Sequence, residues 1–309
     1  MTAHPGETQI EFELRVLHGH RLGAILTPPD PTQPRLKHPT AEELASYPAS
    51  VDLRQHDPPI MNQGSLGSCV AHAWAATFEW LENYAESSVY FAGSRLALYK
   101  WSRDHDGTTG DVGTTPPSMD WVVTNKGVPH ESLWPYDISQ FDVEPPSSVT
   151  TDAAKAKSTA SVAISTNMGQ DTAIADIKKA LNTPLVVPFT FEVYSNYDSV
   201  ESNGLIPMPG GTDVGGHANV VVGYNDATTN LDGSKGAFIV RNSWGTSWGD
   251  KGYGYMPYAF CTSNLMPGAW VISGESEISV TPTPTPTPSG SAPNVNLNAS
   301  VRTYQANKD

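Results

Sequence analysis

The stretch that decides the fold precedes a long helical pattern and reads Gln63-Gly64-Ser65-Leu66-Gly67-Ser68-Cys69-Val70-Ala71. Only one other cysteine, Cys261, occurs in the 309 residues. After Cys69, apolar residues recur three to four positions apart, at Val70, Trp74, Phe78, Leu81 and Ala85. This spacing is typical of one face of a helix of roughly four turns. The pattern therefore predicts Cys69 at a helix N-terminus, with Ser68 as the cap, where unpaired N–H groups favour a thiolate.

Composition limits the partners and the compartment. The formal net charge of −14 leaves no basic stripe to neutralise phosphates, so we expect neither a nucleic-acid nor a membrane partner. No apolar run is long enough to span a bilayer, and the N-terminal residues lack the basic end and apolar core of a secretory signal. Two cysteines permit at most one disulfide. A cytoplasmic or other reducing compartment is the simplest interpretation.

The chain divides into three parts. Residues 1–48 are rich in proline and irregular, and we expect an N-terminal extended arm with one strand over Ile10–Leu17. Residues 49–274 have the length and the helix and strand patterns expected of one compact domain. Residues 275–309 contain four Thr-Pro repeats, which predict an extended spacer of about 25 Å, followed by a polar tail without a fold.

Within the domain, helical patterns come first and strand patterns follow. Two more helices are expected at 94–101 and 171–182. Strands are expected at 185–191, 218–224, 237–240 and 253–256, because β-branched and aromatic runs there are broken by Gly, Asn and Asp. Helices before strands, without strict alternation, favour an α+β fold over a doubly wound sheet.

Three polar residues complete a candidate catalytic site around Cys69. His217 follows a glycine pair at the mouth of a predicted buried strand and is the candidate base that ionises the thiol. Asn242, at the end of the next strand, is the candidate that orients the imidazole. The Gln63 side chain and the Cys69 backbone N–H are the candidate donors to an oxyanion.

Each of these residues alone has a commoner, inert role. A free cysteine is usually a buried small hydrophobe, and a lone histidine or asparagine is usually structural. The four residues together favour catalysis, whereas Cys261 is interpreted as inert. Asp104-His105-Asp106 could suggest a metal site, but an exposed loop explains it better. We expect neither a metal nor an organic cofactor.

The order Gln63, Cys69, His217, Asn242, followed by Ser-Trp-Gly and a second Trp-Gly, resembles the papain-like cysteine peptidases. His217 lies 148 residues after Cys69, within the usual spacing, and Asn242 lies somewhat beyond it. Residues 48–54, 131–136 and 249–258 resemble the bacterial, archaeal and viral branch that lacks the usual disulfides. The likeness covers about residues 48–272.

The resemblance implies a two-subdomain fold with a cleft between a helical half and an antiparallel strand-rich half. Cys69 would lead the helical half, and His217 and Asn242 would lie in the other. Gly113, Gly216 and Trp244 would line the substrate cleft, with Gly113 binding an extended peptide through its backbone. This chain departs from the pattern at three places, where Leu66 replaces a disulfide cysteine, Val70 an aromatic residue and Gly216 an Asp or Asn.

The function implied is that of a cysteine endopeptidase, a monomer that acts on peptides or proteins. The arm is interpreted as a short pro-segment that the enzyme trims itself. A second interpretation is a catalytically silent protein that binds peptides or a partner through an intact cleft. A third is thiol amidase or transferase chemistry, which would use the same residues.

Overall fold

The computed structural model describes residues 16–17, 19–85, 91–164, 166–273 and 294–295. The helices are α2 (Ala41–Ser46), α3 (Cys69–Ala85), α4 (Arg95–His105), α5 (Pro116–Trp121), α6 (Ser147–Ala153) and α7 (Gln170–Asn182). The strands are β1 (Val16–Leu17), β2 (His20–Arg21), β3 (Arg35–Leu36), β4 (Ser50–Asp52), β5 (Ala160–Ala163), β6 (Val187–Tyr194), β7 (Asp213–Thr229), β8 (Lys235–Arg241), β9 (Tyr253–Pro257), β10 (Gly268–Ser273) and β11 (Asn294–Val295).

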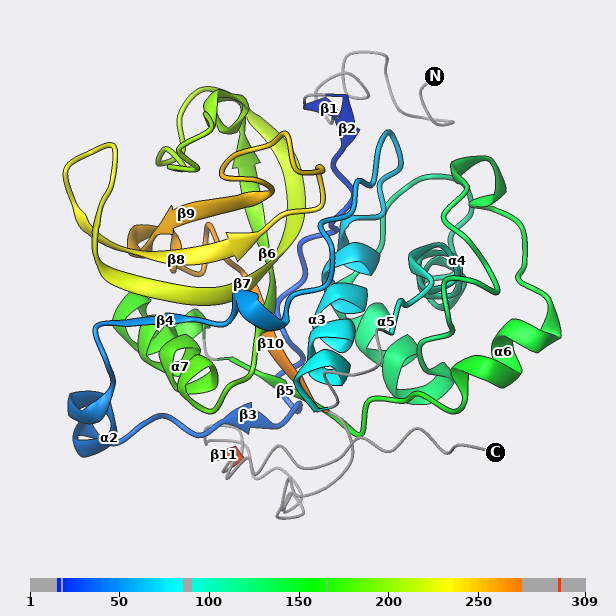
Figure 1. The fold of residues 1–309 in the computed structure, drawn as a ribbon, viewed down its shortest axis with the longest axis horizontal. Helices are drawn as coiled ribbons and strands as arrows, with labels where there is room; N and C mark the ends of the chain where they lie inside the picture. The colour runs from blue at the N-terminus through cyan, green and yellow to red at the C-terminus, as the bar shows by residue number, and fades with distance from the viewer. Residues whose placement is uncertain (1–15, 18, 86–90, 165, 274–293, 296–309) are drawn as a thin grey trace.

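The molecule has a helical half and a strand-rich half, with α3 between them (Figure 1). Helices α4, α5 and α6 lie on one side of α3, and strands β6 to β9 lie on the other. The predicted α+β class is confirmed. The three helices and four strands expected from sequence are all present, although most extend beyond their predicted ends, because tertiary pairing lengthens what a local pattern can show.

The main sheet has the order β11-β3-β5-β10-β6-β7-β8-β9, and β4 pairs with β7 outside this path. Strand β7 is the centre of the strand-rich half, since it pairs antiparallel with β6, β8 and β4 along its 17 residues. His217 lies opposite Phe191 of β6 in this register. The residue predicted at the mouth of a strand is therefore held inside a long one.

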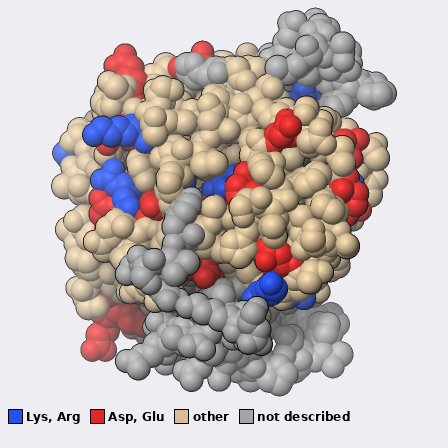
Figure 2. Space-filling view, turned by 45° about the vertical axis from the view of Figure 1, so that its right-hand side comes forward, with Lys and Arg blue, Asp and Glu red and all other residues tan. Residues whose placement is uncertain are grey.

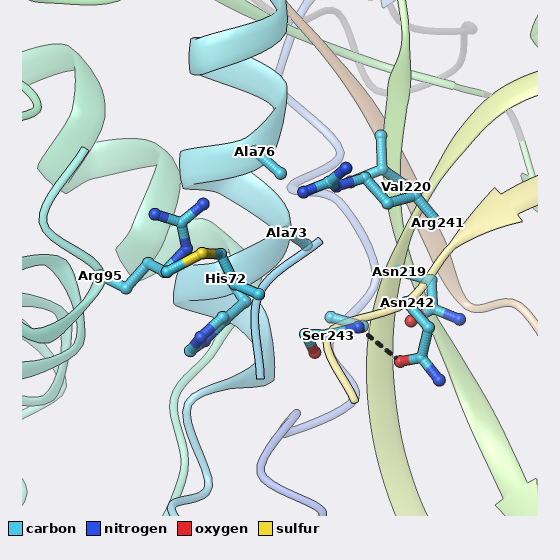
Figure 3. A pocket seen from close by; sticks show the side chains of 11 residues that line it. His72, Ala73, Ala76, Arg95, Asn219, Val220, Arg241, Asn242 and Ser243 are labelled. Carbon is cyan, nitrogen blue, oxygen red and sulfur yellow. Dashed lines mark hydrogen bonds between the residues drawn. The ribbon is translucent and has the colours of Figure 1, made fainter. Parts of the chain in front are cut away.

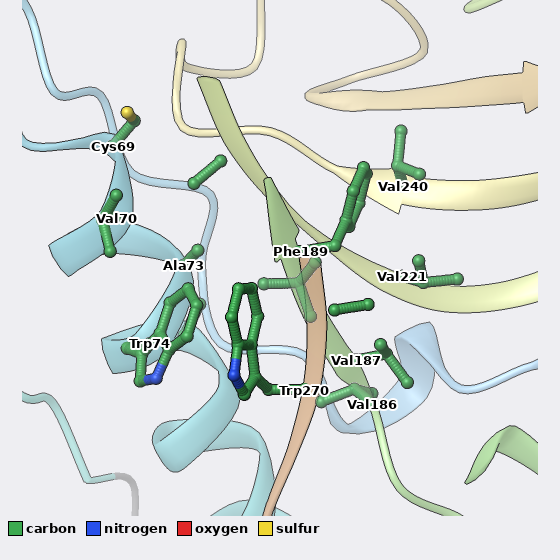
Figure 4. Packing of buried hydrophobic residues seen from close by; sticks show 14 of the residues in the cluster. Cys69, Val70, Ala73, Trp74, Val186, Val187, Phe189, Val221, Val240 and Trp270 are labelled. Atoms are coloured by element: carbon green, nitrogen blue, oxygen red, sulfur yellow. The ribbon is translucent and has the colours of Figure 1, made fainter. Parts of the chain in front are cut away.

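Helix α3 is buried on nearly all sides rather than along one stripe. Its residues from Cys69 to Leu81 are all buried, because the sheet covers one face and α4 and α5 cover the other. Figure 4 shows Trp74 of α3 facing Trp270 of β10, with ring centroids 5.5 Å apart. The indole N–H of Trp74 donates to Asp120 over 2.7 Å. The ring is therefore held by this hydrogen bond as well as by its contact with Trp270. This packing fixes the helix that carries Cys69.

The described part of the arm packs against the domain. Leu36 is buried, and β3 adds to the sheet beside β5, with Arg35 opposite Ala163. The Gln33 side chain donates to Asp120 at 3.3 Å and accepts from the Trp270 indole at 3.3 Å. Of the strand expected at 10–17, only residues 16 and 17 are described, as β1. The Thr-Pro spacer lies outside the described residues, as does all of the tail except 294–295.

Charges on the described surface are dispersed. Figure 2 shows basic side chains on one face in small groups beside acidic ones, with no continuous basic stripe. Lys178, for example, pairs with Asp226 over 2.6 Å. The described part of this face therefore has no basic patch, in agreement with the negative net charge of the chain.

We expect the buried pair between Glu79 of α3 and Arg95 of α4 to be the most stability-sensitive ion pair. Both side chains are almost fully buried and form two hydrogen bonds, of 2.7 and 2.8 Å. Glu79→Ala removes the carboxylate that accepts two hydrogen bonds from the buried Arg95 guanidinium and should cost about 3–5 kcal/mol of unfolding free energy, measured by urea titration. The control Asp52→Ala removes the partner of Arg54 at the surface and should cost less than about 1 kcal/mol. Equal costs would contradict the assignment.

Candidate active site

Cys69 begins α3 and is fully buried. Four backbone N–H groups, from Gly23, Ala218, Val70 and Cys69 itself, favour the thiolate. Burial outweighs them, since desolvation penalises the charged form, and raises the pKa of the thiol to about 11. Burial of the sulfur therefore opposes the thiolate that the helix N-terminus favours.

His217 and Asn242 are joined by a hydrogen bond of 2.8 Å between Nε2 and Oδ1. Asn242 Oδ1 also accepts the Ser243 backbone N–H at 2.7 Å, which identifies this atom as oxygen. Nε2 must therefore carry the proton of the neutral ring, and Nδ1 is the basic atom. Nδ1 is buried and has no hydrogen-bond partner among the described residues. Burial lowers the pKa of His217 to about 4, against the opposing effect of the Asn242 hydrogen bond.

The structure brings these residues to one place from both halves. Ala218, the neighbour of His217 in β7, directs its backbone N–H to the Cys69 sulfur. The Trp244 ring lies 5.0 Å from the His217 ring, between centroids. In Figure 3, Asn242 and Ser243 lie across from α3. Cys69, His217 and Asn242, the three residues proposed from the sequence, therefore lie in one buried region.

Gln63 is fully buried, and three hydrogen bonds fix its amide. Its Oε1 accepts from the Ser243 hydroxyl at 2.8 Å, and Nε2 donates to Leu66 O at 2.9 Å and to Arg21 O at 2.8 Å. Ser243 was not singled out from sequence, although it directly follows Asn242. Its hydroxyl decides which way the Gln63 amide faces.

Residues 20–26, which we call the covering segment, lie over this site. The His20 ring stacks on Trp244 at 5.0 Å, and the Arg21 carbonyl takes the second Nε2 hydrogen of Gln63. Leu22 is buried, and the Ala24 N–H donates to Gly216 O over 3.1 Å. The covering segment therefore excludes solvent from Cys69 and accounts for its burial.

The covering segment pairs with the loop before α5 as a parallel bridge. Thr114 N–H donates to Gly23 O, and Ile25 N–H donates to Thr114 O, both over 3.0 Å. Gly113 was the residue expected to bind a peptide backbone, yet its N–H donates to the Tyr99 hydroxyl at 3.0 Å. Thr114, one residue later, makes the backbone contacts and was missed by sequence reasoning.

Glycine is required where the covering segment passes closest to the site. A Cβ on Gly23 would lie 1.9 Å from Gly67 O, and one on Gly113 would lie 2.2 Å from Gly23 O. A Cβ on Gly216 would lie 2.2 Å from Ala24 O. Because these are backbone atoms, a side chain could not be accommodated by a rotamer change.

The loop expected at 104–106 is wrong, because Asp104 and His105 end helix α4 and Asp106 is its C-cap, although Asp104 and His105 are exposed as expected. Asp106 accepts from the hydroxyls of Thr114 and Thr115, and His105 stacks on Trp121 at 4.2 Å. Within the described ranges, no group of three or more His, Cys, Asp or Glu side chains could hold a metal ion. None of the helices in those ranges is long and apolar enough to cross a membrane.

A cysteine at a helix start, in the same buried region as an Asn-oriented histidine from a second subdomain, is the arrangement of a thiol hydrolase. The profile of the papain family cysteine proteases matches residues 47–270. The chain belongs to this family, whose members are hydrolases acting on peptides or proteins. The resemblance found in the sequence is thereby confirmed.

Individual relatives agree. An uncharacterized peptidase C1-like protein of Acanthamoeba polyphaga mimivirus is 33% identical over 222 residues, which are 69% of this chain and 68% of that protein. Chymopapain of Carica papaya is 29% identical over 216 residues, 69% of this chain and 56% of its own length. The chain thus spans little more than half of the plant relative.

A solved structure shows the same architecture. Xylellain, a cysteine protease from Xylella fastidiosa, superposes with a TM-score of 0.71 at 28% identity, covering 84% of this chain and 97% of that one. The papain-like two-subdomain fold expected from sequence is therefore confirmed.

We expect the chain with its covering segment in place to contain no Cys69 thiolate at neutral pH. The raised pKa of Cys69 and the lowered pKa of His217 leave both groups neutral from about pH 5 to pH 9. Thiolate absorbance near about 240 nm, taken as the difference from Cys69→Ala, should stay absent over this range and appear only as the pH approaches about 11. Intact mass confirms that the arm is present. A thiolate signal at neutral pH would contradict the assignment and indicate an ion pair.

Proposed function

We propose that the chain is a cysteine endopeptidase in which Cys69 is the nucleophile and His217 the acid and base. Asn242 holds the imidazole with Nδ1 as the proton-accepting atom. The Gln63 side chain and the Cys69 N–H form the oxyanion hole. No metal or organic cofactor takes part, and the substrate is a peptide or protein.

The steps follow from these roles. Nδ1 of His217 takes the thiol proton, and the sulfur attacks the peptide carbonyl carbon to give a tetrahedral oxyanion held by Gln63. The C–N bond breaks as the imidazolium returns its proton to the leaving amine. Water, activated by the same imidazole, then hydrolyses the thioester and regenerates the thiol. Proton transfer by one positioned ring contributes typically about 10²–10⁴-fold to such rates.

The observation that carries the proposal is the state of the imidazole. One nitrogen is fixed by Asn242, and the other is buried and has no hydrogen-bond partner among the described residues. The next residue in β7, Ala218, directs its N–H to the Cys69 sulfur. An unpartnered basic nitrogen one residue from a contact to the thiol supports the role of base.

We further propose that the arm is a short pro-segment and that the structure described is the latent state. The covering segment fills the site with Arg21 O on the Gln63 amide and Gly23 over the sulfur. It also leaves the thiol and imidazole neutral. Loss of this segment would rehydrate both groups and allow proton transfer from sulfur to Nδ1.

The neutral pair also suits the second candidate, a silent protein that binds partners through its cleft. A thiol-directed epoxide with a peptide recognition group separates the two. Once the covering segment is displaced, a catalytic protein is labelled at Cys69, and a silent one is not.

We expect Cys69→Ala to abolish hydrolysis across a panel of fluorogenic peptides. Gln63→Ala should lower kcat by roughly 10²–10³-fold, because one oxyanion donor is lost. Cys261→Ala is the matched control, since that thiol is equally buried and has no proposed role. Activity that survives in Cys69→Ala, or is lost equally in Cys261→Ala, would remove the mechanism.

We expect Gly23→Asn to raise the peptidase activity of the full-length chain. A side chain at this position meets Gly67 O and should displace the covering segment. Gly19→Asn is the matched control. Position 19 has open space around it and a φ of 77°, which asparagine tolerates better than most residues.

Initial rates on one fluorogenic peptide, with N-terminal sequencing of the active species, measure both effects. Equal rates for the two variants would contradict latency through the covering segment. Fully active protein that still begins at Met1 would remove self-trimming.

A further inference from the structure

A buried polar chain connects α3 to the Gln63 loop beneath the proposed active site. The Tyr136 hydroxyl lies 2.9 Å from Gln63 O and 2.6 Å from Ser68 Oγ. Ser68 Oγ lies 3.3 Å from His72 Nδ1, which is also 3.1 Å from Ser68 O. None of these three side chains was assigned a catalytic or positioning role from the sequence.

The direction of every proton in this chain can be derived. A carbonyl oxygen only accepts, so the Tyr136 hydroxyl must donate its single proton to Gln63 O. Ser68 must then donate to the Tyr136 oxygen. Ser68 O likewise only accepts, so His72 Nδ1 must carry a proton, which Ser68 O at 3.1 Å and Ser68 Oγ at 3.3 Å share. The order of donation is His72 to Ser68 to Tyr136 to Gln63.

The surroundings of His72 maintain this arrangement. The imidazole is buried, and its neighbours include Arg95, Arg241 and His217. Burial, followed by the charge of Arg95, lowers the pKa of His72 well below its usual value, so the ring is neutral. The Tyr136 ring meets its edge at 4.8 Å, nearly perpendicular. A neutral ring with hydrogen on Nδ1 has an unprotonated Nε2.

His72 lines a small cavity between α3 and strands β7 and β8. Figure 3 shows His72 and Arg95 on one side of this cavity and Arg241, Asn219 and Ser243 on the other. Nε2 of His72 has no hydrogen-bond partner among the described residues. Within the described ranges, His72 has no second hydrogen-bond partner that could take the proton from Nδ1. The direction of donation along the hydrogen bonds is therefore set at Gln63, whose carbonyl oxygen can only accept.

We propose that His72, Ser68 and Tyr136 form a one-directional hydrogen-bond relay that positions Gln63, and that His72 and Tyr136 are positioning residues for the oxyanion hole. The inference deepens the proposed function and rests on it. Both backbone polar groups of Gln63 are hydrogen-bonded, since its N–H donates to Ser243 O over 2.8 Å and its carbonyl accepts from Tyr136. Ser243 also fixes its side chain. Removing the Tyr136 hydroxyl frees one of these restraints and leaves the thiol and imidazole untouched.

The first test reads the relay without any catalysis. In the full-length Cys69→Ala protein at neutral pH, long-range ¹⁵N–¹H spectra should show His72 as the neutral tautomer protonated on Nδ1. His217 should show the opposite tautomer, with its proton on Nε2, which makes it an internal reference. A His72 proton on Nε2, or a charged His72 ring, would overturn the relay.

The second test separates positioning from general damage. In the full-length chain carrying Gly23→Asn, in which we expect the covering segment to be displaced, Tyr136→Phe should lower kcat on a fluorogenic peptide by about tenfold, less than the loss of a whole oxyanion donor, with KM unchanged. The rate of Cys69 alkylation by iodoacetamide should not change, because that substitution forms no oxyanion. Tyr224→Phe is the matched control, since its hydroxyl is bonded to Pro48 O and Asn182 away from the site.

Variants of His72 provide the rescue. His72→Phe removes the donor and should reproduce the Tyr136→Phe defect, whereas His72→Asn keeps an N–H close to the Nδ1 position and should restore most of kcat. Equal kcat in Tyr136→Phe and Tyr224→Phe, or a parallel loss of alkylation, would overturn the inference. A Gly23→Asn chain that hydrolyses no peptide would overturn the proposed function instead, and the tautomer of His72 would still decide the relay.

Discussion

The docking of the first turn of α3 against β7 is the constraint on which the site depends. Cys69 comes from the helical half, and His217 comes from the strand-rich half, so neither half contains a site by itself. The meeting is possible because small residues lie at the contact, with Ala218 directing its N–H to the sulfur. Aromatic packing behind it, between Trp74 and Trp270, prevents the helix from sliding. Geometry at the sulfur is thus set by the core rather than by the loops around it.

The same burial that encloses Cys69 and His217 disfavours the charged form of both groups. A thiol and an imidazole exchange a proton readily only when the resulting charges are solvated or paired, and here both are enclosed. The covering segment accomplishes this with backbone atoms and glycine, and its single stacked ring, His20, lies on Trp244. Latency in this protein is therefore proposed to be a matter of desolvation as much as of steric blockage.

Much of the fold and the candidate site could be predicted, because the signals were local. The spacing after Cys69 and the Gly-Gly-His and Asn-Ser-Trp-Gly stretches are contiguous in sequence. The covering segment could not be predicted, since its partners Thr114 and Gly216 are far away in the chain and its own residues show no periodicity. His72 was missed for a related reason. A search for one apolar face ignores polar residues on a helix that is buried all round.

The Gln63 amide has two hydrogens, and both are used, one by Leu66 and one by Arg21. In the proposed mechanism, loss of the covering segment would release only the hydrogen that Arg21 O accepts, while Ser243 and Leu66 would still hold the amide. The carbonyl of a substrate would then take the position that the Arg21 carbonyl occupies now. The oxyanion donor would therefore need no rearrangement before the first substrate binds.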